Sequence, residues 1–75
     1  MSKLQDIRLA KEMSQNDLAE KSGVSKRTIQ CYEQGTRPID GAGLNHLCSL
    51  SLALGCRIDD ILEDEKLIKC YKKVR

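Results

Sequence analysis

The sequence predicts an all-α fold, a compact bundle of four to five short helices around an aliphatic core. The chain has 75 residues, which is enough for one small domain. Aliphatic side chains recur at helical spacing, and because Phe and Trp are absent, Leu dominates the expected core. Three of the periodic segments are followed by a glycine, at Gly23, Gly35 and Gly55, where a left-handed residue commonly ends a helix.

The first helix is expected from Leu4 to Glu12. Leu4, Ile7 and the aliphatic stem of Lys11 fall on one face of this helix, at positions i, i+3 and i+7. Arg8 adjoins the same face, and a charge beside an apolar surface requires a partner.

The second helix is expected to open at Ser14, which is a good N-cap residue. Asp17 stands three residues later, in the capping-box position. Leu18 and Ala19 form the inner side of this helix. Gly23 ends it, because only glycine adopts a left-handed backbone at little cost.

The third helix is expected from Lys26 to Gln34, with Ser25 as its cap and Val24 packed in the corner before it. At about 100° per residue, this helix divides into two faces. The polar face has basic residues at its start and consists of Lys26, Arg27, Gln30, Cys31 and Gln34. The inward face consists of Ser25, Thr28, Ile29 and Tyr32.

The pattern after Gly35 is less regular. A loop rich in turn residues runs to Gly43, where the fourth helix begins and continues to Leu54. Its inward stripe consists of Leu44, Leu47, Leu50, Ser51 and Leu54. A short fifth helix carries Ile58, Ile61 and Leu62. The last ten residues fit either a sixth helix, with Leu67, Ile68 and Tyr71 on one face, or a short strand. We therefore take residues 1–65 as the domain and residues 66–75 as a basic tail of uncertain structure.

Composition argues against several classes of function. The four cysteines form no C-x-x-C pair, and His46, the single histidine, has no partner at metal-ligand spacing, so we expect no metal, no disulfide and no cofactor. Reduced thiols are typical of the cytoplasm, where we expect the chain to reside. No apolar run reaches membrane-spanning length, and no histidine adjoins a nucleophile. We therefore expect neither a membrane protein nor an enzyme.

The net charge of +2 is unevenly distributed along the chain. Residues 1–37 hold seven basic and five acidic side chains, and residues 38–65 hold one basic and six acidic side chains. Residues 66–75 hold five basic side chains and no acidic one. This polarity favours an anionic partner at the basic end, although charges that only solvate a small surface would give the same counts.

Between Ser14 and Pro38 the chain reads S-Q-x-x-L-A-x-x-x-G-V-S-x-x-T-I-x-x-Y-E-x-G-x-R-P. This pattern resembles that of the phage-repressor-like helix-turn-helix family, of the Cro/cI or XRE type. The resemblance extends from about Leu4 to Leu62 and implies the lambda-repressor-like DNA-binding fold, with the helix-turn-helix at the second and third helices. The chain departs from the pattern at Arg57, where the family often has a Ser or Thr cap.

The resemblance implies that the third helix enters the major groove of double-stranded DNA, with its N-terminal residues at the base edges. By position, the base-contacting residues would be Lys26, Arg27, Gln30 and Cys31. Arginine suits this role because its planar fork donates two hydrogen bonds to guanine, and glutamine pairs with adenine. The phosphate-contacting residues would be Gln15, Ser25, Thr36 and Arg37.

Two further features concern structure and assembly. Arg8 and Glu33 stand where the family has a buried ion pair, which would orient the third helix. We also expect a homodimer, with an interface built from apolar residues that remain after the core is filled. These residues are Ile58, Ile61, Leu62, Leu67, Ile68 and Tyr71. The alternative is that the core of a single chain absorbs them.

The sequence thus predicts a sequence-specific transcriptional regulator that represses as a dimer on a palindromic DNA operator. Three alternatives stay open: the antitoxin of a toxin–antitoxin module, a protein-interaction module that has lost DNA binding, and a binder of single-stranded nucleic acid. The joint presence of Lys26, Arg27, Gln15 and Arg37 argues against the second alternative. The scarcity of aromatic side chains argues against the third.

Overall fold

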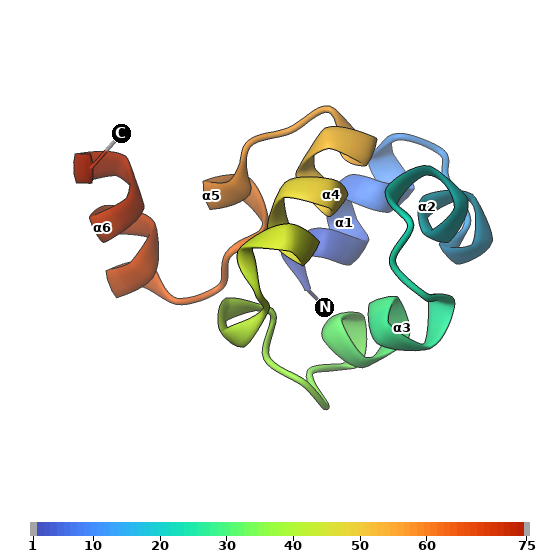
Figure 1. Cartoon of the computed structure of the whole chain (residues 1–75), viewed down its shortest axis with the longest axis horizontal. Helices are drawn as coiled ribbons and strands as arrows, with labels where there is room; N and C mark the ends of the chain where they lie inside the picture. The colour runs from blue at the N-terminus through green and yellow to red at the C-terminus, as the bar shows by residue number, and fades with distance from the viewer. Residues whose placement is uncertain (1, 75) are drawn as a thin grey trace.

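The computed structural model describes residues 2–74, and over that range it contains six α-helices, one short 3₁₀ helix and no strand (Figure 1). The elements are α1 (Lys3–Ala10), α2 (Gln15–Ser22), α3 (Lys26–Gln34), η1 (Ile39–Gly41), α4 (Leu44–Leu54), α5 (Ile58–Ile61) and α6 (Glu65–Val74). The all-α prediction is therefore confirmed. The tail, for which the sequence allows helix or strand, forms α6.

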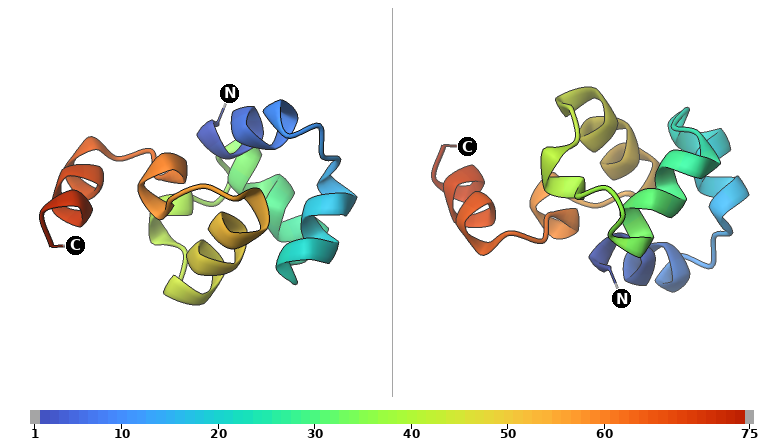
Figure 2. Two further views of the ribbon diagram at one scale, coloured as in Figure 1. Left: turned by 90° about the horizontal axis from the view of Figure 1, so that it is seen from above. Right: turned by 90° about the horizontal axis from the view of Figure 1, so that it is seen from below.

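Helices α1 to α5 form the body of the domain, and α6 stands to one side of it (Figures 1 and 2). Within the body, α2 packs against α3 and α4, while α1 packs against α3 and α5. Helix α6 packs chiefly against α5, which spans only four residues. A single chain therefore covers only part of the surface of α6.

The core of the body is aliphatic, as the composition predicts. Its largest fully buried side chains are Leu4, Leu18, Ile29, Leu50, Leu54 and Ile61. The expectation that Leu44 faces inward is wrong, because this side chain is 67% exposed. Leu44 is the first residue of α4, whereas Ser51, two turns later on the same face, is buried, so the exposure of Leu44 reflects its place at the end of the helix.

Helix α1 ends at Ala10, before the predicted end at Glu12. Glu12 adopts a left-handed conformation with φ of 58°, and the Met13 amide donates to the Arg8 carbonyl at 3.1 Å. The chain thus turns away from the helix axis at this point. As a consequence Lys11, whose stem the sequence places on the inner face, is exposed.

Side-chain hydrogen bonds define the starts of α2 and α5. The Ser14 hydroxyl accepts from the Asp17 amide, and the Asp17 carboxylate accepts from the Ser14 amide, both at 3.0 Å. This reciprocal pair is the predicted capping box. Helix α2 ends at Gly23 with φ of 77°, a left-handed conformation that costs other residues about 1–2 kcal/mol. At α5, the Asp60 carboxylate accepts from the Arg57 amide at 2.9 Å, which compensates for the missing Ser or Thr cap.

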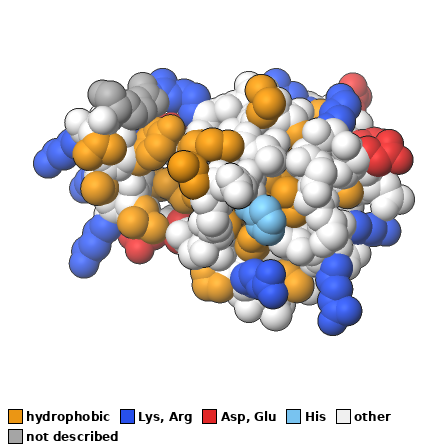
Figure 3. Space-filling view, in the orientation of Figure 1, with side chains coloured by type: hydrophobic (Ala, Val, Ile, Leu, Met, Phe, Trp, Pro, Cys, Tyr) orange, Lys and Arg blue, Asp and Glu red, His pale blue; other side chains and the backbone are white. Residues whose placement is uncertain are grey.

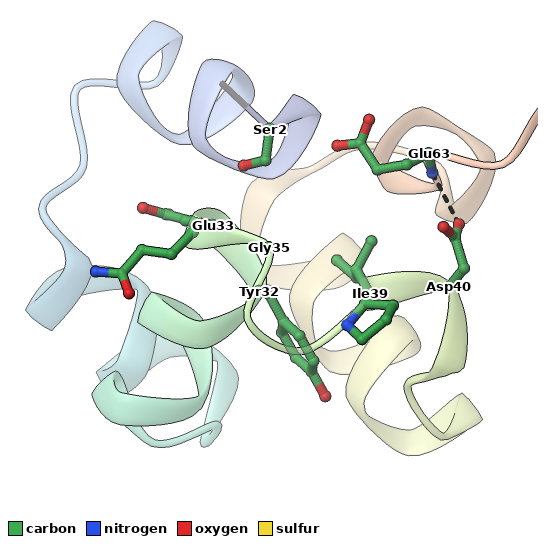
Figure 4. Close-up of a pocket in the computed structure, with 9 residues that line it drawn as sticks. Ser2, Tyr32, Glu33, Gly35, Ile39, Asp40 and Glu63 are labelled. Atoms are coloured by element: carbon green, nitrogen blue, oxygen red, sulfur yellow. Dashed lines mark hydrogen bonds between the residues drawn. The ribbon is translucent and has the colours of Figure 1, made fainter.

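Carboxylates also fix the linker between α5 and α6. Asp40 Oδ1 accepts from the Glu63 amide at 2.8 Å (Figure 4) and from the Asp64 amide at 3.1 Å. Glu63 Oε2 in turn accepts from the Lys3 amide at 2.7 Å. These bonds join the linker to η1 and to the start of α1. They border a cleft of about 380 Å³ that reaches the end of α3.

Candidate nucleic-acid interface

Helices α2 and α3 are joined by a tight turn that fixes the orientation of α3. Val24 is buried in the corner, and Ser25 caps α3 by accepting from the Thr28 amide at 3.2 Å. Ile29 and Tyr32 hold α3 to the core, with 0% and 4% of their surface exposed. Because these anchors lie on one side of α3, its other side points out of the protein.

The outward side of α3 carries the residues that the resemblance implies for base contact. Lys26 and Arg27, in the first turn, are exposed, while Gln30 and Cys31, one turn later, are half-buried. Lys and Arg side chains project at the edge of the molecule where α3 lies (Figure 3). The structure therefore brings these four residues together on one accessible face.

A buried ion pair joins α1 to α3. Arg8 Nε donates to Glu33 Oε2 at 2.7 Å, and Arg8 Nη2 donates to Glu33 Oε1 at 3.1 Å. The side chains are only 8% and 3% exposed. Arg8 Nη1 donates to the Met13 carbonyl at 2.8 Å, so each nitrogen of the guanidinium has a partner. This geometry is that of the ion pair implied by the resemblance, and it restrains the last turn of α3.

Two glutamines extend this network to the surface of α3. Gln15 Nε2 donates to Glu33 Oε1 at 2.9 Å, and Gln30 Nε2 donates to Gln15 Oε1 at 3.2 Å. A carboxylate only accepts hydrogen bonds, so it fixes the Gln15 amide with its oxygen toward Gln30. Gln30 must then present its NH₂ group to Gln15. Its carbonyl oxygen and its second N–H remain for another partner.

A family model described as the Cro/C1-type HTH DNA-binding domain matches residues 3–66. The chain belongs to this family. The match begins with α1 and ends just inside α6, so it includes the whole helix-turn-helix unit. No curated protein and no solved structure matches the chain. The resemblance drawn from the sequence is confirmed, and the chain carries a DNA-binding domain.

Three residues for which the resemblance implies contact with DNA phosphates lie at the two ends of α3. They are Ser25, Thr36 and Arg37. Thr36 and Arg37 are exposed just beyond the helix, where the Arg37 amide donates to the Cys31 carbonyl at 3.3 Å. Ser25 is exposed at the start of α3, but its hydroxyl is 2.8 Å from the Thr28 hydroxyl. Ser25 can therefore donate to a phosphate only when Thr28 is the donor of that bond.

The N-terminus of α2 carries a fixed negative charge, the carboxylate of Asp17. Hydrogen bonds from Ser14, that from its backbone amide first, lower the pKa of Asp17 below the ordinary value of 3.8. Asp17 is thus ionised at neutral pH, and its carboxylate is held at the helix end by the capping box. An approaching phosphate would meet this charge, which opposes the attraction of the helix dipole.

His46 has a structural role in the Cro/C1-type domain that the sequence does not reveal. The Tyr32 hydroxyl lies 3.0 Å from His46 Nδ1, at hydrogen-bond distance, and the two rings are edge to face with centroids 6.3 Å apart. This contact links α3 to the first turn of α4. No local pattern predicts this contact, because the two residues are 14 positions apart on different helices.

The apolar residues expected at a dimer interface divide into two groups. Ile61, Leu62 and Ile68 are 0%, 5% and 7% exposed, so a single chain buries them and they offer no surface to a second copy. These three residues therefore belong to the core of the single chain, which is the alternative given above. Ile58 and Tyr71 are half-buried and Leu67 is 41% exposed.

No grouping of three or more potential metal ligands occurs within residues 2–74, and no helix in that range could cross a membrane. The cysteines are free thiols. Burial raises the pKa of the Cys56 thiol, with the nearby Asp60 carboxylate as a second cause, so its reactive thiolate form is disfavoured.

Proposed function

We propose that this chain is a transcriptional repressor that binds a specific operator in double-stranded DNA as a homodimer. The observation that carries the proposal is the fixed orientation of α3. Ile29 and Tyr32 anchor its inner face, and the Arg8–Glu33 ion pair restrains its end. A rigid helix with a polar, basic outer face suits insertion into the major groove, which admits one α-helix.

Base recognition is assigned to the first two turns of α3. Lys26 and Arg27 are exposed there, and an arginine or lysine donates to guanine O6 and N7, a contact that discriminates between bases by about 1–3 kcal/mol. Gln30 has a free carbonyl oxygen and a second N–H because Gln15 occupies only one of its hydrogens. That pair of groups matches adenine, which donates from N6 and accepts at N7.

We assign the positioning of the protein along the DNA to polar side chains around α3. Gln15 keeps one N–H of its amide, Arg37 and Thr36 are exposed beyond the helix, and Ser25 is exposed before it. Contacts of this kind go to phosphates, hold the protein in position and supply most of the salt-dependent affinity. A dimer bound across a palindrome would then block access of other proteins to the same site, which is the simplest mode of repression.

Selection of bound DNA from a random duplex pool tests the proposal. We expect an enriched inverted repeat whose half-sites lie about 10–10.5 base pairs apart, one helical turn, because two α3 helices of a dimer must enter successive major grooves. The Arg27→Ala variant, folded by circular dichroism, serves as the control and should lose the preference at one base step in each half-site. The absence of any enriched sequence at modest ionic strength would count against the proposed function.

A further inference from the structure

A groove of about 420 Å³ lies between α4, α5 and α6, on a different part of the molecule from the outer face of α3. Its lining consists of Cys48, Ser51, Leu52, Cys56, Arg57, Ile58 and Tyr71. Small-molecule sites have volumes of about 300–1,000 Å³, are mostly apolar, and carry a few polar groups that orient the ligand. The groove has this size, and its lining contains both kinds of group.

The apolar part of the groove is open to solvent. Leu52 is 85% exposed, the highest exposure among the large apolar side chains of residues 2–74. Cys48 stands one turn before Leu52 on the same face of α4, while Ile58 and Tyr71 line the groove from α5 and α6. Figure 3 shows hydrophobic side chains gathered over α6 and over the neighbouring end of the body. An apolar ligand chain that lies along these residues removes apolar surface from water on both sides.

The Ser51 hydroxyl is a polar group of the groove that lacks a partner. Ser51 is only 5% exposed, and its hydroxyl oxygen has no hydrogen-bond partner among the described residues. A buried hydroxyl without a hydrogen bond is unfavourable, because the contacts that it makes with water in the unfolded chain are not replaced. Since Ser51 lines the groove, an acceptor on a ligand can supply the missing bond.

Arg57 gives the groove its charge. Of the described residues that line the groove, Arg57 alone carries a charged side chain, which is 53% exposed. Its Nε lies 3.3 Å from Asp59 Oδ1, and the terminal nitrogens of a guanidinium offer four further N–H donors in a fork that matches a carboxylate. The Asp59 side chain is 5% exposed, and the Asp60 carboxylate accepts from the Arg57 amide at 2.9 Å. Neither carboxylate lines the groove, so the groove favours an anionic ligand group.

The two polar groups lie at the same end of the groove. The Cys56 amide donates to the Ser51 carbonyl at 3.0 Å where α4 ends, and Arg57 is the next residue. Cys48 lies on α4 one turn farther from this end. The polar groups therefore gather where α4 gives way to α5, and the apolar surface extends from them along α4.

We propose that this groove binds a small amphipathic carboxylate with an unbranched apolar chain. The carboxylate accepts hydrogen bonds from the terminal nitrogens of Arg57 and from the Ser51 hydroxyl. The apolar chain lies along Leu52 toward Cys48, with Tyr71 of α6 on its other side. Such a ligand contacts α4, α5 and α6 together and holds α6 to the body. The site is separate from α3, so the inference does not depend on the proposed binding of DNA.

Titration of the full chain with octanoate in the absence of DNA, followed by calorimetry and by NMR of the backbone amides, tests the site. Octanoate should bind saturably, one molecule per chain. Octylammonium, which has the same apolar chain and the opposite charge, should bind at least about tenfold more weakly. Amide shifts should change in the groove residues and not in α3. Amide hydrogens of α6 should exchange more slowly when octanoate is bound, because the ligand holds α6 to the body.

Two substitutions test the polar groups. Ser51→Ala should weaken octanoate binding about threefold or more without lowering the melting temperature of the free chain, because the hydroxyl has no bond to lose. Arg57→Gln should weaken octanoate binding about tenfold or more and leave binding of 1-octanol unchanged. Arg57→Lys keeps a charge beside Asp59 and should have an intermediate affinity. Lys21→Gln removes one positive charge at an exposed position of α2, outside the groove, and is the matched control.

Several results would overturn the proposal. They are equal affinity for octanoate and octylammonium, no saturable binding of octanoate at millimolar concentrations, and amide shift changes centred outside the groove. A groove covered by a second copy of the chain would also overturn it. In that case the amide shifts of the groove residues would depend on chain concentration without octanoate, and octanoate would not change them.

Discussion

Removal of the Glu33 carboxylate should destabilise the domain strongly. In the Glu33→Ala variant the Arg8 guanidinium loses two of its three hydrogen bonds and keeps only that to the Met13 carbonyl. The Arg8 side chain is 8% exposed, so water replaces the lost partner poorly. Stranding one charge of a buried pair costs about 3–5 kcal/mol. A domain of this length has a total stability of only about 4–11 kcal/mol, so the loss is a large fraction of it.

Urea unfolding followed by circular dichroism measures this loss, and a double variant separates its causes. Replacing both partners, as Arg8→Met with Glu33→Leu, removes the charges together and should cost far less than Glu33→Ala, because a well-packed apolar pair often matches a buried ion pair in stability. Glu20→Ala, at an exposed position on α2, is the control and should change stability by less than about 0.5 kcal/mol. A loss below about 1 kcal/mol in Glu33→Ala would refute the reasoning from burial.

The same double variant tests the link from the ion pair to base recognition. Without a carboxylate at position 33, nothing fixes the Gln15 amide, and Gln30 loses its defined orientation. The folded double variant should therefore discriminate less at the adenine read by Gln30. Its salt dependence should change little, since Arg37 is intact and Gln15, the phosphate contact that loses its fixed orientation, carries no charge. Unchanged discrimination would show that the glutamine network does not position Gln30.

Three further predictions follow from single contacts. Arg27→Ala should relax preference at one base step, whereas Arg37→Ala should weaken binding to all sequences alike and reduce the salt slope by about one; identical effects of both changes in binding titrations would contradict the division of roles. Gly23→Ala should lower the free energy of unfolding by about 1–2 kcal/mol, and with it the melting temperature in calorimetry, because alanine is strained at a φ of +77°. A Cβ at this position meets nothing within 4 Å, so the strain is the only cost, and an unchanged melting temperature would contradict the prediction. The pKa of Asp17, measured by NMR, should lie below 3.8 and should rise in Ser14→Ala. Because folding lowers this pKa, the ionised Asp17 stabilises the folded domain at pH values above the unfolded pKa, and this contribution disappears as the pH falls from 3.8 through the folded value. A measured pKa of 3.8 or higher would refute this prediction.

Features determined by neighbouring residues could be predicted from the sequence. The capping box at Ser14 needs only Asp17 three residues away, and the end of α2 needs only a glycine that accepts a positive φ. The inward face of α3 followed from the helical spacing of Ile29 and Tyr32, both of which are buried. These predictions succeed because helical geometry and local hydrogen bonds decide them.

Features determined by tertiary packing could not be predicted in the same way. Leu44 has the spacing of a core residue, but as the first residue of α4 it lies at the end of the helix and is exposed. Ile61 is apolar like Leu67, but the packing of α5 against the body buries Ile61 in the core, whereas Leu67 on α6 stays 41% exposed. The bond between Gln15 and Gln30 depends on how α2 crosses α3, which no local pattern encodes.

Substitution of single guanines in a selected operator by 7-deazaguanine tests the central claim most directly. This base lacks only N7, an acceptor in the major groove. If α3 lies in that groove, one substitution per half-site should weaken binding of the wild-type chain by about 1–3 kcal/mol and leave the Arg27→Ala variant unaffected. Equal affinity of the wild-type chain for the substituted and unsubstituted duplexes at every guanine would contradict the account.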